Sequence, residues 1–368
     1  MGPARKADEM TEQEAGADQE RRVDLVLEGG GVKGNALVGA LSVLEERGFQ
    51  SQNVAGASAG AIVAVLHAAG YAAHELRDLI KDLDFNRFRD KSWVDRIPLV
   101  GSPLSILTDL GIYEGEQLLE YIGELLEDKG VRTYADLIRD ADEEEARYRY
   151  KAQIIASDIT GRQLLVLPKD APKLGVDNPD EFNVALSVRM SLSIPIFFEP
   201  VKFNNAKTGQ DHLIVDGGLL SNFPVWLFDT DGEPEWPTFG LRLVEPDPRT
   251  TTLAERLAPR EHDQGKLEAV IDYFKSLVDT VLEAHDRLYI ERADFARTIP
   301  IDTLGVRTTD FALTSEMALA LYESGRTAAE QFLDTWSFEG YIAAFRRGKE
   351  HSRRREVAEL MSRASQRG

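Results

Sequence analysis

The stretch VDLVLEGGGVKG, residues 23–34, decides the fold. Its first half, Val23 to Glu28, is an apolar run of the length of a buried strand, and the glycines after it lead directly into an apolar helical pattern from about Asn35 to Arg47. Gly48 is expected to end that helix as its C-terminal cap. A strand that passes through a tight glycine turn into a helix is the building unit of α/β folds.

A second unit of the same kind follows. A strand is expected near Asn53 to Gly56, and Ala57-Ser-Ala-Gly60 leads into a helix that ends near Gly70. Two such units predict an α/β sandwich with a largely parallel sheet. Further elements are expected downstream: a mostly helical stretch over 73–140, paired strands over 148–157 and 163–167, a helix over 178–193 with a packed connection over 194–200, strands over 212–215 and 238–243, and only helices beyond Pro248, among them 314–336 and 339–361.

Composition excludes several classes of function. The chain has 368 residues, with 63 Asp and Glu against 43 Lys and Arg, and its net charge of −20 argues against nucleic acid as a partner. The absence of cysteine excludes disulfides, thiolate catalysis and every metal site that uses cysteine ligands. No metal or cofactor is expected. With 43% hydrophobic residues the chain can bury a sizeable core.

No membrane-crossing or secretory segment is expected. Residues 1–22 lack the apolar centre of a signal peptide and are interpreted as a flexible tail. Residues 55–73 carry no charge and contain the spacing Gly56-x-x-x-Gly60 of close-packed membrane helices, but their large apolar residues are few. The stretch is therefore interpreted as a buried helix. The protein is expected to be cytoplasmic, either free or at the periphery of the membrane.

The glycine-rich loop first suggests a nucleotide. Gly29-x-Gly31-x-x-Gly34 has the spacing and the strand-to-helix context of the dinucleotide fingerprint. That fingerprint also needs an acidic residue at the end of the next strand, where this chain has Gly56-Ala-Ser58 instead. A phosphate-binding P-loop needs Ser or Thr after the lysine, and Lys33 is followed by Gly34. A nucleotide-binding oxidoreductase is therefore a minor alternative.

The serine is the stronger signal. Gly56-x-Ser58-x-Gly60, between a strand and a helix, has the pattern of a nucleophile elbow, in which a sharp turn exposes the serine hydroxyl. A serine nucleophile needs an oxyanion hole, and the N–H groups of the glycine loop could converge on a developing negative charge. The candidates for that hole are Gly29, Gly30, Gly31 and Gly34.

The general base is less obvious from the residues. None of the six histidines follows a strand in a glycine-flanked loop, and His285 lies in a helical pattern. Asp216-Gly217-Gly218 follows an expected strand, and its two glycines would let the backbone approach another loop closely. A carboxylate bonded directly to Ser58 would make a Ser–Asp dyad, whereas an Asp-Gly-Gly sequence by itself is more often a turn.

At this point the motifs resemble those of a known family. Gly29-Gly-Gly-Val-Lys33-Gly34, Gly56-Ala-Ser58-Ala-Gly60, Ser191-Leu-Ser-Ile-Pro195 with Phe198-Glu-Pro200, and Asp216-Gly-Gly218 occur in the order seen in patatin-like phospholipases. The resemblance covers about residues 23–245. It implies a three-layer α/β/α fold with a mixed, largely parallel sheet, and a calcium-independent Ser–Asp dyad that acts on acyl-lipid esters.

The resemblance implies a role for each residue whose position matches a family motif. Ser58 is the nucleophile, Asp216 the base, and Gly29–Gly31 with Gly34 the oxyanion hole. Lys33 takes the basic position of the loop, where it either contacts the lipid phosphate or orders the loop. The expected organisation is a tail over 1–22, a catalytic domain over 23–245, and a helical region over 246–368 that packs on the core.

The expected activity is hydrolysis of fatty-acyl esters of phospholipids or lysophospholipids, with transient contact to a membrane surface. A soluble carboxylesterase or thioesterase and a nonenzymatic lipid-binding regulator are alternatives. Residues 345–368 carry eight Arg and Lys against three Glu, so they are either a solvated helix face or a contact for anionic lipid. Residues 85–112 are interpreted either as an apolar cap over the site or as core. Oligomeric state is left open.

Overall fold

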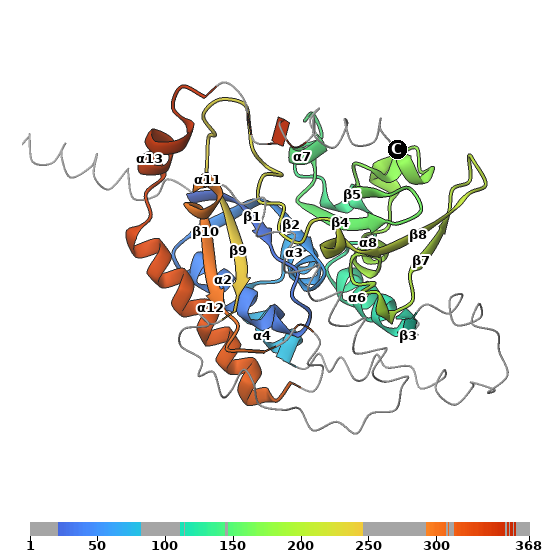
Figure 1. Ribbon diagram of the computed structural model, residues 1–368, viewed down its shortest axis with the longest axis horizontal. Coiled ribbons are helices and arrows are strands. Elements are labelled where there is room, and N and C mark those ends of the chain that lie inside the picture. Colours follow the sequence, from blue (N-terminus) through green and yellow to red (C-terminus); the bar gives the residue numbers. More distant parts are fainter. Residues whose placement is uncertain are drawn as a thin grey trace, which may run out of the picture.

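A mixed sheet forms the centre of the molecule. The computed structural model describes residues 21–81, 111–113, 115–143, 146–245, 292–306, 308, 313–349, 352, 354–355 and 357. The strands of the central sheet are β1 (Arg21–Leu27), β2 (Phe49–Ala57), β4 (Ala152–Asp158), β5 (Gln163–Leu167), β7 (Val201–Asn204), β8 (Asp211–Asp216), β9 (Thr238–Val244) and β10 (Thr298–Asp302). Their order is β10-β9-β1-β2-β4-β8-β7, with β5 also paired to β4 (Figure 1).

Most of the sheet is parallel, as predicted. Strands β10, β9, β1, β2 and β4 run in one direction, whereas β5 and β8 are antiparallel to β4, and β7 is antiparallel to β8. Helices flank this sheet, so the expectation of an α/β/α architecture with a C-terminal helical region is confirmed. A separate two-stranded sheet joins β3 (Gly111–Tyr113) to β6 (Ile196–Phe198).

The first two helices begin at the glycine turns that the sequence predicts. The helices are α2 (Gly34–Glu46), α3 (Ala59–Ala68), α4 (Ala73–Lys81), α6 (Glu116–Asp128), α7 (Ala146–Arg149), α8 (Val184–Ser191), α11 (Arg292–Phe295), α12 (Ser315–Thr335) and α13 (Phe338–Tyr341). Short 3₁₀ segments lie at 31–33, 134–137, 171–174, 179–181 and 217–219, and a π-helical turn lies at 342–346.

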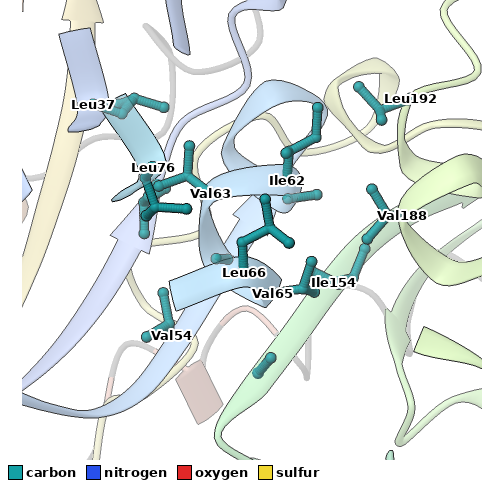
Figure 2. Close-up of a cluster of buried hydrophobic side chains, with 14 of the residues drawn as sticks. Leu37, Val54, Ile62, Val63, Val65, Leu66, Leu76, Ile154, Val188 and Leu192 are labelled. Atoms are coloured by element: carbon teal, nitrogen blue, oxygen red, sulfur yellow. The ribbon is translucent and has the colours of Figure 1, made fainter. Parts of the chain in front are cut away.

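Helix α3 is the centre of the larger hydrophobic core. It is apolar on all sides, as expected for a helix with no face in solvent. Figure 2 shows Ile62, Val63, Val65 and Leu66 of α3 surrounded by side chains from several other elements, including the labelled Leu37, Val54, Leu76, Ile154, Val188 and Leu192. The uncharged stretch 55–73 is thus the end of a strand and a buried ten-residue helix.

The parallel strands define two opposite edges of the sheet. We call the edge at which β1, β2, β9 and β10 end the carboxyl edge, and the edge at which they begin the amino edge. Helix α12, drawn in orange in Figure 1, runs antiparallel to β10, because Ser324 bonds to the Asp302 carbonyl while Trp336 bonds to the Ala296 carbonyl. The first turn of α12 therefore projects past the carboxyl edge, and its last turn lies at the amino edge.

Several expectations from sequence were wrong. The region beyond Pro248 contains a strand, β10, which pairs with β9 at the edge of the sheet. The expected helix 178–193 is divided, because Phe182 and Asn183 are extended and Asn183 caps a new helix through Leu186 N–H. The connection 194–200 contains β6, and the expected helix 339–361 is interrupted at Arg347.

Other expectations fall outside the described residues. These are residues 1–20 of the expected tail, whose last two residues in fact begin β1, residues 85–110 of the expected cap 85–112, the region 246–291 and most of the segment after 349. Within the described chain, no helix is both long enough and apolar enough to cross a membrane.

Candidate active site

Strand β4 brings Ser58 and Asp216 together. Strand β5 pairs with one side of β4 along Ile154 to Asp158. Because β2 and β8 pair with residues in the same part of β4, both must lie along its other side. Ala57, at the end of β2, pairs with Ile155, and Asp216, at the end of β8, pairs with the next residue, Ala156. Two strands that approach from opposite directions therefore end against consecutive residues of β4. Ser58 follows Ala57 directly, and this places it beside Asp216.

Ser58 occupies a strained turn. Its φ of 49° with ψ of −125° lies in a region that non-glycine residues rarely adopt, a kind of strain that is common at functional sites. The turn is possible because Gly56 and Gly60 touch backbone to backbone: a Cβ on Gly56 would lie 2.2 Å from the Gly60 carbonyl oxygen. The Ser58 N–H donates to Ser191 Oγ at 2.9 Å, and Ser191 in turn donates to the Ile155 carbonyl.

The carboxyl group of Asp216 is fully buried. Burial raises its pKa to about 7, against smaller lowering effects of the Ser58 hydroxyl and the Gly218 N–H, which donates to Oδ1 at 2.8 Å. The other oxygen, Oδ2, has no well-formed hydrogen bond to any described residue, although Ser58 is close enough to affect the pKa. Hydrogen bonds of this kind are often long before substrate binds. Gly217 packs against the Ile155 carbonyl, where a side chain would not fit.

The glycine loop has two N–H groups without a hydrogen bond. The Gly29 N–H donates to the Asn222 carbonyl, and the Gly34 N–H donates to the Gly31 carbonyl. Among the described residues, the N–H groups of Gly30 and Gly31 have no acceptor. Of the four glycines suggested by the sequence, these two are the ones able to donate to a negative charge.

Asn222 is a residue of the site that the sequence interpretation missed. Its Nδ2 donates to the Gly29 carbonyl at 3.0 Å, and its own carbonyl accepts the Gly29 N–H at 3.2 Å. A Cβ on Gly29 would lie 2.1 Å from Asn222 Oδ1 and 3.1 Å from Ser58 Cβ, so Gly29 is held between the two residues. The sequence signal was weak: Asn222 stands six residues after Asp216, in a loop.

Lys33 is buried beside the loop. Its side chain is only 8% exposed, its Cε lies near Gly30, and no carboxylate among the described residues forms an ion pair with it. The Val32 N–H before it donates to the Thr308 carbonyl, which ties the loop to the chain between β10 and α12. A buried cation next to free N–H groups is suited to an anionic ligand.

Two of the three described histidines have partners away from Ser58, and the third, His74, is exposed on α4. His67 contacts Ser51, and His212 contacts the buried Asp158 at 2.7 Å. His262, His285 and His351 lie outside the described residues. The described part of the chain also has no cluster of three or more acidic or histidine side chains suited to a metal ion.

Comparisons with known proteins bear on the family and the fold. The sequence model named patatin-like phospholipase matches residues 25–229. An uncharacterized protein of Bacillus subtilis, YqhO, is 39% identical over 319 residues, which cover 86% of this chain and 99% of YqhO. A probable lipid hydrolase of invertebrate iridescent virus 6, 463L, is 27% identical over 55% of this chain and 61% of its own. The crystal structure of VipD from Legionella pneumophila has the same fold, with a TM-score of 0.51 and 21% identity over 86% of this chain and 67% of VipD.

Proposed function

Because the chain belongs to the patatin-like phospholipase family, we propose that it hydrolyses fatty-acyl esters of phospholipids or lysophospholipids through a dyad of Ser58 and Asp216. The observation that carries the proposal is the pairing on β4, where Ala57 and Asp216 face consecutive residues. The strained backbone of Ser58 beside a buried carboxylate supports the same assignment.

The reaction takes place in two steps. Asp216 accepts the hydroxyl proton of Ser58 while Oγ attacks the ester carbonyl, and the N–H groups of Gly30 and Gly31 stabilise the oxyanion. The C–O bond of the ester breaks, the alcohol leaves with the proton from Asp216, and an acyl-serine remains. Water then gives a proton to Asp216 and its oxygen to the acyl carbon. The fatty acid leaves, and Ser58 regains its proton.

Lys33 is proposed to contact the phosphate of the substrate. It is the buried cation beside the two free N–H groups, and burial of an unpaired ammonium is costly unless an anion approaches it. In this role it would bind the headgroup of a phospholipid and add nothing to the hydrolysis of a neutral ester.

The carboxyl edge is proposed to be the face that meets lipid. Of the five large apolar side chains that are exposed among the described residues, Ile159 follows β4, Leu304 follows β10, and Met317 and Leu319 lie in the first turns of α12, all at the edge that carries Ser58. Only Phe295 lies at the amino edge. Exposed apolar residues gathered around a candidate lipase site suit contact with a lipid surface.

The described start of the basic C-terminal segment, at Arg346 and Ser352, lies at the other edge. Arg346 donates to the carbonyls of Thr230 and Gly232, and the Ser352 N–H donates to Asp231. This loop is anchored at the amino edge, because Asp229 pairs with Arg297, the residue before β10. These described residues therefore lie away from Ser58. We propose that the apolar carboxyl edge, rather than the basic segment, contacts the membrane.

Product analysis with two variants tests the function. Ser58→Ala and Asp216→Asn are expected to lower the release of fatty acid from phospholipid vesicles by at least about 10³-fold. Lys202→Gln, a change at an exposed cation of β7, serves as the folded control and should retain activity. Full activity of Ser58→Ala would overturn the proposal. Vesicle binding without labelling of Ser58 by a fluorophosphonate would indicate a nonenzymatic lipid-binding protein, and preference for short thioesters a soluble thioesterase.

A further inference from the structure

A pocket opens at the amino edge, at the opposite end of β2 from Ser58. It has a volume of about 540 Å³, which is within the range of small-molecule sites. It lies where β1, β2 and β9 begin and where α12 ends. Its lining consists of Arg21, Arg22, Arg47, Phe49, Glu235, Trp236, Pro237, Leu333, Trp336 and Phe338.

The charged residues of this pocket favour an anion. Its lining holds three guanidinium groups and one carboxylate, and with the neighbouring Asp334 the excess is one positive charge in a chain with a net charge of −20. Arg22 pairs with Glu235, and Arg47 pairs with Asp334 at 3.0 Å. Arg21 has no carboxylate partner among the described residues and donates only to the Arg47 carbonyl at 3.3 Å. A negatively charged ligand would supply the missing partner.

The aromatic residues hold two of the arginines in place. The guanidinium of Arg21 lies over the ring of Phe49, 5.7 Å from its centre, and that of Arg22 lies over Trp236 at 4.6 Å. A guanidinium that stacks on a ring still has its in-plane N–H groups, which match the two oxygens of a carboxylate. The pocket therefore contains fixed donors for such a group.

The rest of the lining indicates what the anion carries. Besides the arginines and Glu235, every lining side chain is aromatic or aliphatic, and Trp336 uses its indole N–H on the Ala296 carbonyl. Among the described residues that line the pocket, no amide, hydroxyl or imidazole side chain could hydrogen-bond a nucleobase or a sugar. Such a lining fits a long apolar chain that ends in one charged group.

We propose that this pocket binds the anion of a long-chain fatty acid, with the carboxylate between Arg21 and Arg22 and the chain along Trp236, Leu333 and Trp336. The site is separate from the Ser58 edge, because the two lie at opposite ends of β1 and β2. The proposal does not depend on the proposed reaction, although that reaction would release a ligand of this class.

Binding of dodecanoate below its micelle concentration tests the proposal. The full chain with Ser58→Ala prevents turnover, and two of the four tryptophans line the pocket, so their fluorescence reports occupancy. Dodecanoate is expected to change this fluorescence saturably, and the double variant Arg21→Gln, Arg22→Gln should bind it about ten-fold or more weakly. Lys202→Gln, an exposed cation paired with Asp211 on another strand, is the matched control and should bind normally.

Further variants distinguish binding at this pocket from binding at the Ser58 site, and further ligands test the preference for a fatty-acid anion. Trp336→Phe should remove part of the signal and leave that of Trp236, whereas Lys33→Gln at the carboxyl edge should leave binding unchanged. If the double variant fails to fold, the single variant Arg21→Gln, at the arginine whose side chain bonds only to the Arg47 carbonyl among the described residues, should weaken binding on its own. Equal affinity for dodecanol, tighter binding of ADP than of dodecanoate, or normal binding by the arginine variants would each overturn the proposal.

Discussion

Asn222 holds Gly29 from both sides, and in doing so it sets the direction of the Gly30 N–H. Its side-chain Nδ2 donates to the Gly29 carbonyl at 3.0 Å, while its backbone carbonyl accepts the Gly29 N–H. The Gly29 carbonyl and the Gly30 N–H belong to one peptide unit, and in a trans peptide they point in opposite directions. With the carbonyl fixed toward Asn222, the Gly30 N–H must point away from Asn222.

Replacing this contact should reduce turnover rather than substrate binding. In Asn222→Asp, a carboxylate would face the Gly29 carbonyl without a donor, so the peptide is expected to rotate and remove one oxyanion donor. Loss of one such donor typically lowers kcat by about 10²–10³-fold. Steady-state kinetics should show a fall in kcat with little change in KM, and Asn222→Gln should restore part of the rate if the amide donor is what matters.

A matched substitution controls for the added charge. Asn178→Asp makes the same chemical change at an exposed cap, where the side-chain oxygen still accepts the Asp180 N–H. This variant should keep normal kinetics. If Asn222→Asp raised KM and left kcat unchanged, Asn222 would act in substrate binding and the orientation of the Gly30 peptide would be irrelevant.

Lys33 provides a test of headgroup recognition. Lys33→Gln removes the buried charge and is expected to raise KM for a phospholipid by about ten-fold or more, since a hydrogen bond to a charged group contributes about 1.5–3 kcal/mol. Hydrolysis of a neutral p-nitrophenyl ester should be almost unchanged. Lys33→Arg should recover phospholipid activity. An equal loss on both substrates would instead indicate that Lys33 orders the glycine loop.

The raised pKa of Asp216 predicts the pH dependence of activity. The base must be ionised to accept the Ser58 proton, and its pKa in the folded protein is about 7. The value of kcat/KM should therefore rise about ten-fold per pH unit below about pH 6 and level off above about pH 8. A profile measured with a soluble ester avoids the effects of pH on lipid. A rate that is constant down to about pH 5 would exclude Asp216 as the base.

The same shift predicts a cost in stability. Because the folded pKa is above the ordinary value of 3.8, the folded state binds a proton that the unfolded chain has released between these pH values. Stability from this group is thus complete below about pH 4 and is lost as pH rises to about 7. Asp216→Asn cannot ionise, so its stability gain over the wild type should be larger at about pH 8 than at about pH 5, by about 1–3 kcal/mol.

Asp211, at the other end of β8, is the control for that measurement. Asn204 and Lys202 lower its pKa, which is the opposite direction. Denaturant unfolding of Asp211→Asn should show no extra stability at higher pH. If both variants gained stability equally as pH rose, the effect would come from the overall negative charge of the chain, and the burial of Asp216 would not be its cause.

Local glycine patterns were enough to predict the strands and turns that carry Ser58 and Asp216, because those turns need small residues at fixed positions. They were not enough for β10, whose five residues include Pro300. Proline is tolerated only because β10 is an edge strand, and its pairing with β9 joins residues 58 positions apart. Nor could the sequence tell that Gly29 donates to Asn222, since 193 residues separate them. Donor assignments of this kind depend on the tertiary structure.

The lipid-facing edge can be tested against the basic segment directly. Leu319 is 56% exposed in the first turns of α12, and Leu319→Asp should weaken co-sedimentation with phosphatidylcholine and phosphatidylglycerol vesicles, because a charge would enter the lipid interface. Phe295→Asp makes the same change at an equally exposed apolar residue of the amino edge and should bind normally.

Arg347→Gln with Lys349→Gln, on the exposed part of the basic segment, should also have little effect. Truncation is best placed after Arg355, since Arg346 is buried and holds the 230–232 loop. Loss of vesicle binding in the basic-segment variants, with Leu319→Asp unaffected, would mean that the amino edge meets the membrane and that Ser58 faces away from it.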